Sequence, residues 1–93
     1  MSTYSQRDPF ALLVECLKKD GLTEASDKLH ILRHEMAWTT GTELIGEFGQ
    51  AMVSMRRVVK RGASAETKDA WRESARIVRK AWPSFWNWYF LRM

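Results

Sequence analysis

The sequence predicts a single all-α domain, a four-helix bundle-like fold with a short aromatic helix at its C-terminus. Between Pro9 and Pro83, the two prolines of the chain, apolar residues recur at helical spacing, and no alternating strand pattern of useful length is found. A length of 93 residues fits one domain. We expect a flexible polar N-terminus over residues 1–7 and one helical domain over residues 8–93.

The first helix is expected to begin at Asp8 and Pro9. An aspartate can cap the helix, and a proline suits the first turn, where no amide donor is needed. Gly21 suits the position just after the helix, and basic residues precede it near the negative end of the helix dipole. The apolar face of this helix is formed by Phe10, Leu13, Val14 and Leu17.

The second helix is expected to begin at a cap formed by Thr23 or Ser26 and to break near residues 38–41. Its apolar face is formed by Ala25, Leu29, Leu32 and Met36.

Part of this segment resembles the helix-turn-helix of Fis-type regulators, through Thr23-Glu24-Ala25, Leu29, Ile31 and Arg33. The resemblance implies a DNA-reading turn near residue 30. However, His30 stands where that family has glycine, and the turn is unfavourable without it. One continuous helix is therefore the simpler interpretation.

The third helix is expected over about residues 41–60, with Thr40 as its cap and Glu43 three residues later. Its seam repeats at spacings of three and four, as in packed bundles, through Ile45, Phe48, Met52, Met55 and Val59. A second line carries small residues, at Gly46 and Gly49. Those glycines predict the close approach of another helix backbone, with a merely tolerated weak helix as the alternative.

The fourth helix is expected to follow the break at Gly62, with Ser64 as its cap. Its apolar face is formed by Trp71, Ala75, Val78 and Trp82. Pro83 should stop it, and Ser84 can cap a short last helix over residues 85–91.

Composition narrows the class of protein. Hydrophobic residues make up 45% of the chain and charged residues 28%, which fits a folded soluble domain. No apolar run is long enough to span a bilayer and no secretory signal pattern opens the chain, so we expect no transmembrane segment and a cytoplasmic location. Cys16 is the single cysteine, which excludes an internal disulfide and a cysteine-based zinc site.

Catalytic and metal motifs are not found, and we expect neither an enzyme nor a cofactor. The glycines fit no phosphate-binding spacing, and no serine lies in a nucleophile elbow. Asp27, His30 and His34 lie on one helix face at a spacing that can hold zinc. This face lies opposite the apolar stripe, so a solvated face is the preferred interpretation and no metal site is predicted.

Charge is divided unevenly along the chain. Residues 1–55 carry five Lys and Arg against eight Asp and Glu, a net charge of −3, whereas residues 56–93 carry ten against three, a net charge of +7. If the third and fourth helices form an antiparallel hairpin, seven cations form one basic surface that suits phosphate groups. They are Arg56, Arg57, Lys60, Arg61, Lys68, Arg72 and Arg76. Local pairing and the helix dipole are the alternative explanations.

Aromatic residues are concentrated at the C-terminus: Trp82, Phe85, Trp86, Trp88, Tyr89 and Phe90. One short helix cannot bury all of them in so small a domain, and Trp and Tyr are frequent at binding hot spots. The alternative is that the segment folds back and closes the core.

These observations favour a small non-enzymatic interaction or regulatory protein of the inhibitor or adaptor kind. We expect it to form a homodimer, to bind a larger protein, or to do both, with the aromatic segment and the third helix as its contact surface. The alternative is a nucleic-acid-binding regulator that uses the basic surface. The two predictions differ in their expected response to salt.

Overall fold

The computed structural model describes residues 9–38, 42–84 and 87–91, and in these ranges every regular element is a helix. The helices are α2 (Pro9–Lys19), α3 (Thr23–Trp38), α4 (Thr42–Gly62), α5 (Ala65–Ala81) and α6 (Trp88–Leu91). The all-α prediction is confirmed. The predicted flexible N-terminus, the Thr40 cap, and Phe85 and Trp86 of the aromatic segment lie outside the described residues.

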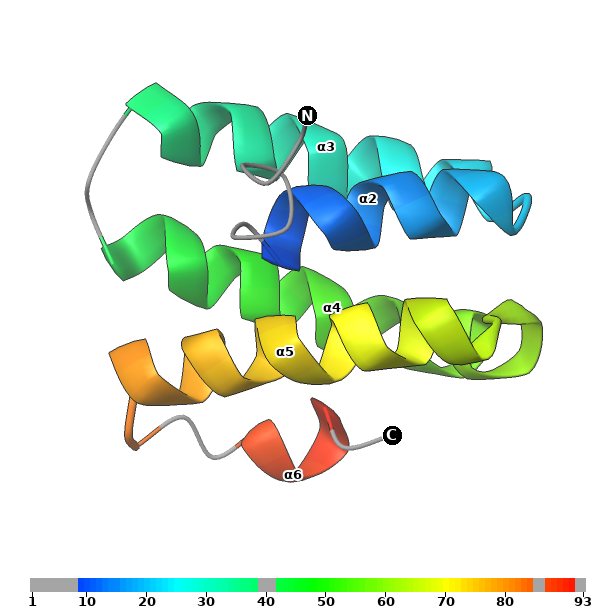
Figure 1. Cartoon of the computed structure of the whole chain (residues 1–93). Helices are drawn as coiled ribbons and strands as arrows, with labels where there is room; N and C mark the ends of the chain where they lie inside the picture. Colours follow the sequence, from blue (N-terminus) through cyan, green and yellow to red (C-terminus); the bar gives the residue numbers. More distant parts are fainter. Residues whose placement is uncertain (1–8, 39–41, 85–86, 92–93) are drawn as a thin grey trace.

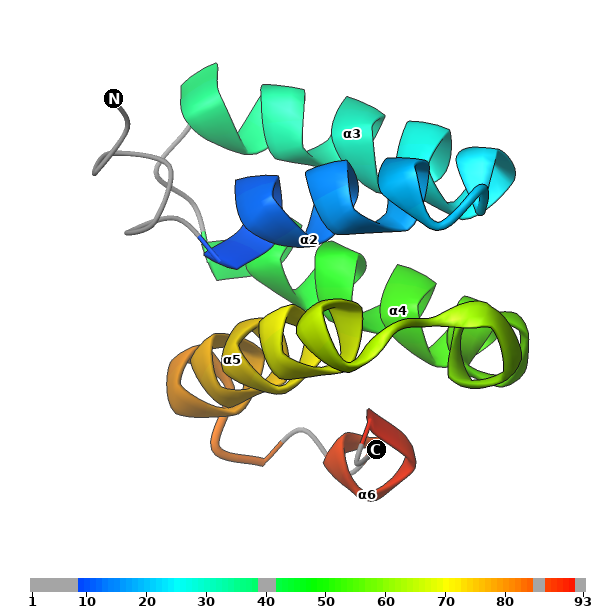
Figure 2. The same ribbon diagram turned by 45° about the vertical axis from the view of Figure 1, so that its right-hand side comes forward.

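The four longer helices pack as a ring. α2 contacts α3 and α5, and α4 contacts the same two helices from the other side. Figures 1 and 2 show α3 and α2 as one pair and α4 and α5 as the other. α6 lies outside this ring, where it packs on both α4 and α5. α6 therefore packs against the two helices that carry most of the cations.

The core is formed by the apolar faces that the sequence predicts. Leu13 and Leu17 of α2, Leu29 of α3 and Trp71 of α5 are fully buried. The seam of α4 is buried from Phe48 to Val59, with Ile45 partly buried at its start. The Phe10 and Phe48 rings pack with centroids 4.5 Å apart. The spacing of apolar residues thus predicted which side of each helix turns inward, although the Met36 side chain lies outside the described structure and Trp82, at the end of α5, is only half-buried.

Gly21 ends the first helix as predicted. Its φ of 83° lies in the left-handed region, which glycine adopts without steric cost. The Leu22 amide donates to the Leu17 carbonyl at 2.9 Å, which closes the turn.

The prediction that Thr23 or Ser26 caps α3 is wrong, because the Ser26 amide donates to the Leu22 carbonyl at 2.9 Å and the cap position therefore falls at Leu22. α3 already begins at Thr23, and Ser26 is buried inside its first turns. Its Oγ donates to the Val14 carbonyl at 2.9 Å, so the hydroxyl joins α3 to α2 instead of capping α3. α3 also continues through His30, which confirms one continuous helix across the segment that resembles a helix-turn-helix.

Hydrogen bonds join two turns that are far apart in the sequence, the turn at Asp20 and the turn before α5. Ser64 caps α5 as predicted, because its Oγ accepts from the Thr67 amide at 3.3 Å. The Ser64 amide in turn donates to Oδ2 of Asp20 at 2.9 Å, and the Thr67 hydroxyl donates to the same oxygen. These hydrogen bonds hold the pKa of Asp20 below its ordinary value. The larger effect comes from the Thr67 hydroxyl and a smaller one from the Ser64 amide.

Candidate interaction surface

Among the described side chains, a buried leucine and two hydrogen bonds attach α6 and the residue before it to the domain. Leu91 is fully buried, and its carbonyl accepts a hydrogen bond from Nε1 of Trp71 at 2.7 Å. At the other end of the segment, Nδ2 of Asn87 donates to Oε1 of Gln50 on α4 at 3.1 Å. A helix of four residues does not form alone in water, so these contacts hold it in place.

The attached helix presents two aromatic rings to solvent. Tyr89 is 68% exposed and Phe90 is 50% exposed. The two rings meet edge to face, with centroids 5.9 Å apart. Of the other predicted contact residues, Trp82 is half-buried, and the side chains of Phe85, Trp86 and Trp88 lie outside the described structure.

Leu91, which joins α6 to the core, was not predicted as a core residue. One feature of the sequence could have predicted its burial, since Leu91 is the one aliphatic residue within an aromatic segment. The two predicted roles of this segment, core closure and contact surface, are therefore divided between residues: Leu91 closes the core, and Tyr89 and Phe90 face outward.

Phe90 shares a hollow with two arginines of α4. The hollow has a volume of about 370 Å³ and is lined by Val53, Ser54, Arg56, Arg57 and Phe90. A hollow lined by an aromatic residue and two arginines offers apolar area together with positive charge. Part of the predicted basic surface is thus adjacent to part of the predicted aromatic surface.

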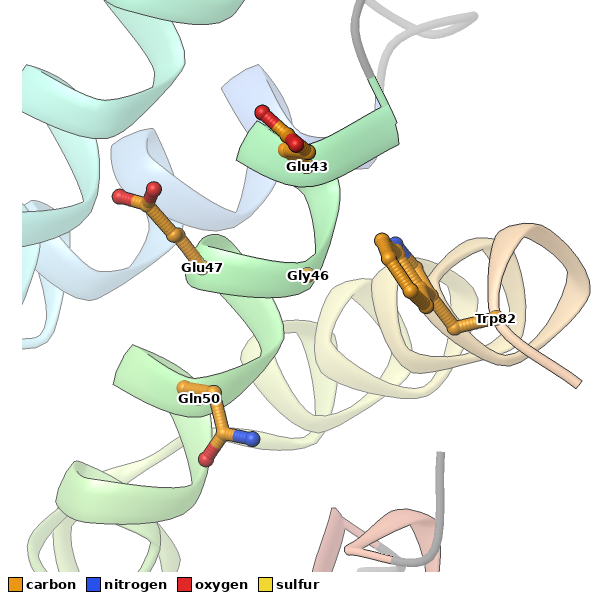
Figure 3. A pocket seen from close by; sticks show the side chains of 5 residues that line it. All are labelled: Glu43, Gly46, Glu47, Gln50 and Trp82. Atoms are coloured by element: carbon orange, nitrogen blue, oxygen red, sulfur yellow. The ribbon is translucent and has the colours of Figure 1, made fainter. Parts of the chain in front are cut away.

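A second hollow lies nearer the start of α4 and carries the opposite charge. Figure 3 shows its lining, formed by Glu43, Gly46, Glu47, Gln50 and Trp82, and its volume is about 510 Å³. A Cβ added at Gly46 would lie 3.1 Å from Nε1 of Trp82. The sequence predicted that a helix backbone approaches this glycine, but the neighbour is the indole ring of Trp82.

The remaining cations of the predicted basic surface differ in their surroundings. Lys60 and Arg61 are exposed at the end of α4, whereas Lys68 is half-buried. Arg72 pairs with Asp69, and Arg76 lies 3.5 Å from Glu73, so both already have a local counter-charge. Exposed pairs at this helical spacing are weak, but they lower the local positive potential.

Metal-binding and nucleophilic groups do not assemble in the part of the chain that the structure describes. No group of three His, Cys, Asp or Glu side chains is found there that could hold an ion. Asp27, His30 and His34 are exposed on α3. Cys16 is buried, and this burial, followed by the negative charge of Glu66, raises the pKa of its thiol. A thiol with a raised pKa is a poor nucleophile.

Comparison with known proteins gives no further assignment: no family, curated protein or solved structure is found to match this chain. Across the described ranges, no helix combines the length and apolar character needed to cross a membrane. The fold and the surface define a small all-α protein in which Phe90 of α6 lies in one hollow with Arg56 and Arg57 of α4.

Proposed function

We propose that this chain is a small non-enzymatic interaction protein, a four-helix bundle-like domain whose aromatic C-terminal helix takes part in self-association, in binding to a larger protein, or in both. The observation that carries the proposal is the exposure of Tyr89 and Phe90 on a helix that Leu91 and Trp71 attach to the core. Two rings held in a fixed position lose little conformational entropy on binding, which makes them effective anchors.

Charge and location complete the proposal. Arg56 and Arg57 flank Phe90, so the surface suits a partner that offers apolar side chains with acidic ones around them. A cytoplasmic location fits a single thiol that is buried and reduced. A regulatory role, as an inhibitor or adaptor, fits a chain of this size whose main feature is a contact surface.

The test is the concentration dependence of the molar mass, measured by light scattering. Tyr89→Ala and Phe90→Ala should weaken self-association roughly tenfold or more, because a truncated anchor ring costs about 2 kcal/mol. Ile31→Ala is the matched control, since Ile31 is an apolar side chain of α3 that is 60% exposed and far from α6 in the sequence. Equal behaviour of all three variants would remove the aromatic helix from the contact.

A second candidate function is nucleic-acid binding, and one observation favours it. The hollow beside Phe90 combines a ring on which a base could stack with two arginines that could bind phosphate. Titration with mixed-sequence single-stranded DNA and RNA at several salt concentrations tests it. Arg57→Ala should lower the salt slope by about one, and Arg72→Ala should have less effect because Asp69 already pairs with Arg72.

A further inference from the structure

Six exposed side chains follow one line along α4, which we call the α4 stripe. Their spacings are four, three, four, three and four residues, which place them on one face of the helix. The stripe begins with two acids, continues with two uncharged polar residues and ends with two arginines. Its members are Glu43, Glu47, Gln50, Ser54, Arg57 and Arg61.

The α4 stripe is complementary to itself when its direction is reversed. If a second copy of α4 lies antiparallel to the first, with a two-fold axis level with Met52, every acid faces an arginine and the uncharged residues face each other. Each facing pair then occurs twice, as an isologous interface requires. The pairs are Glu43 with Arg61, Glu47 with Arg57, and Gln50 with Ser54. We propose that two copies of this chain pair through the α4 stripe.

The two hollows beside the stripe fit the same register. Trp82 lies against Gly46, and Phe90 shares a hollow with Val53, seven residues further along the same side of α4. The two-fold axis lies between the two copies and is perpendicular to both α4 helices. The side of α4 that carries Gly46 and Val53 is therefore on the same side of the pair in both copies. The hollow beside Trp82 would therefore face the hollow beside Phe90 of the second copy, and acidic lining would meet basic lining. Phe90 would be covered in the pair.

The helix dipole does not explain the whole stripe. Acids near an N-terminus and cations near a C-terminus are favourable in any helix, but the effect falls off within the first and last turn. Glu43 and Arg61 lie in those turns of α4, whereas Glu47 and Arg57 lie more than one turn inside the ends. The pair Glu47 and Arg57 therefore separates intermolecular pairing from a dipole effect.

The test reverses these two charges one at a time and together. Glu47→Arg alone places two arginines opposite each other at both symmetric positions, and Arg57→Glu alone places two glutamates there. Each should weaken the dimer roughly tenfold, because one change acts twice and replaces attraction by repulsion. The double variant Glu47→Arg with Arg57→Glu restores both pairs. Light scattering and sedimentation give the mass, and circular dichroism confirms the helical fold.

Mixing the two single variants gives the sharpest readout. A chain with arginine at both positions complements a chain with glutamate at both, so an equimolar mixture should form a heterodimer more tightly than either variant pairs with itself. Glu24→Arg and Lys80→Glu are the matched controls, since they make the same charge changes at exposed positions of α3 and α5. Neither control should change the mass, alone or mixed.

The inference deepens the self-association in the proposed function, and its failure is distinguishable from failure of that proposal. A dimer that weakens with Phe90→Ala but ignores every charge reversal would overturn the α4 stripe and leave the aromatic contact in place. A chain that is monomeric at all concentrations would overturn the stripe as well. Association that occurs only when nucleic acid is present, with no recovery of the dimer in the double variant, would also overturn the pairing through the α4 stripe.

Discussion

Two contacts join different pairs of elements in this domain, and they depend on different chemistry. Asp20 joins the turn before α3 to the start of α5 through two hydrogen bonds at a partly exposed position. Trp71 joins α5 to α6 through a fully buried indole and one hydrogen bond to the Leu91 carbonyl. The polar attachment depends on the ionisation of one carboxylate, whereas the buried one depends on packing. The two should therefore respond to different perturbations.

The largest expected effect comes from breaking the buried attachment. Trp71→Ala should lower the free energy of unfolding by about 3–5 kcal/mol, because it leaves a large cavity in the core. Chemical denaturation followed by far-UV circular dichroism measures this loss. Trp71→Phe keeps most of the packing and removes the hydrogen bond to Leu91, so it should cost less and free α6 selectively. A near-neutral Trp71→Ala would contradict the burial of this face.

A smaller effect is expected from the polar attachment. Asp20→Asn should cost about 1 kcal/mol, because the hydrogen bonds from Ser64 and Thr67 lose a charged acceptor at a partly exposed site. Asp27→Asn, which removes an exposed carboxylate of α3, is the control.

The pH dependence of the polar attachment has a definite sign. The pKa of Asp20 is lowered by the Thr67 hydroxyl and the Ser64 amide, so the ionised carboxylate stabilises the folded state. This contribution is complete above the ordinary pKa of an aspartate, about 3.9, and is lost as the pH falls from there through the lowered pKa. The Asp20→Asn variant should lack this part of the acid transition. An identical acid profile in both proteins would show that the contact contributes nothing.

The smallest expected effect is at Gly46, where two terms oppose each other. Alanine in a helix is favoured over glycine by about 1 kcal/mol, but its Cβ would press on the Trp82 indole. Gly46→Ala should therefore change stability by less than about 1 kcal/mol in the native chain and stabilise by about 1 kcal/mol in a Trp82→Ala background. Additive effects in this double-mutant cycle would show that the indole and position 46 do not interact.

The sequence predicted local features far better than contacts between distant residues. The apolar faces of the four long helices, the Ser64 cap and the Gly21 turn follow from spacing and from the backbone preference of a few residue types. The Asp20 contact and the Leu91 anchor did not, because each joins residues 20 or more positions apart. Ser26 was misjudged because its hydroxyl bonds a carbonyl of a neighbouring helix, 12 positions earlier in the chain.

The predicted sites show the same difference between local features and contacts between distant residues. Composition predicted an aromatic surface and a basic surface, and the fold shows that Phe90 borders Arg56 and Arg57. No periodicity could indicate this adjacency, because it depends on where α6 lies against α4. In contrast, the charge order of the α4 stripe is a property of one helix and can be read along the chain once its exposed face is known.

The buried thiol of Cys16 gives this chain an internal reporter of its own opening. A thiol-specific reagent can react with it only when α2 separates far enough from its neighbours to admit the reagent, since the side chain is 3% exposed. Because the chain has one cysteine, each molecule is labelled at one position, and mass spectrometry counts the molecules that have opened. The labelling rate of the native protein therefore measures how often the core opens without any denaturant.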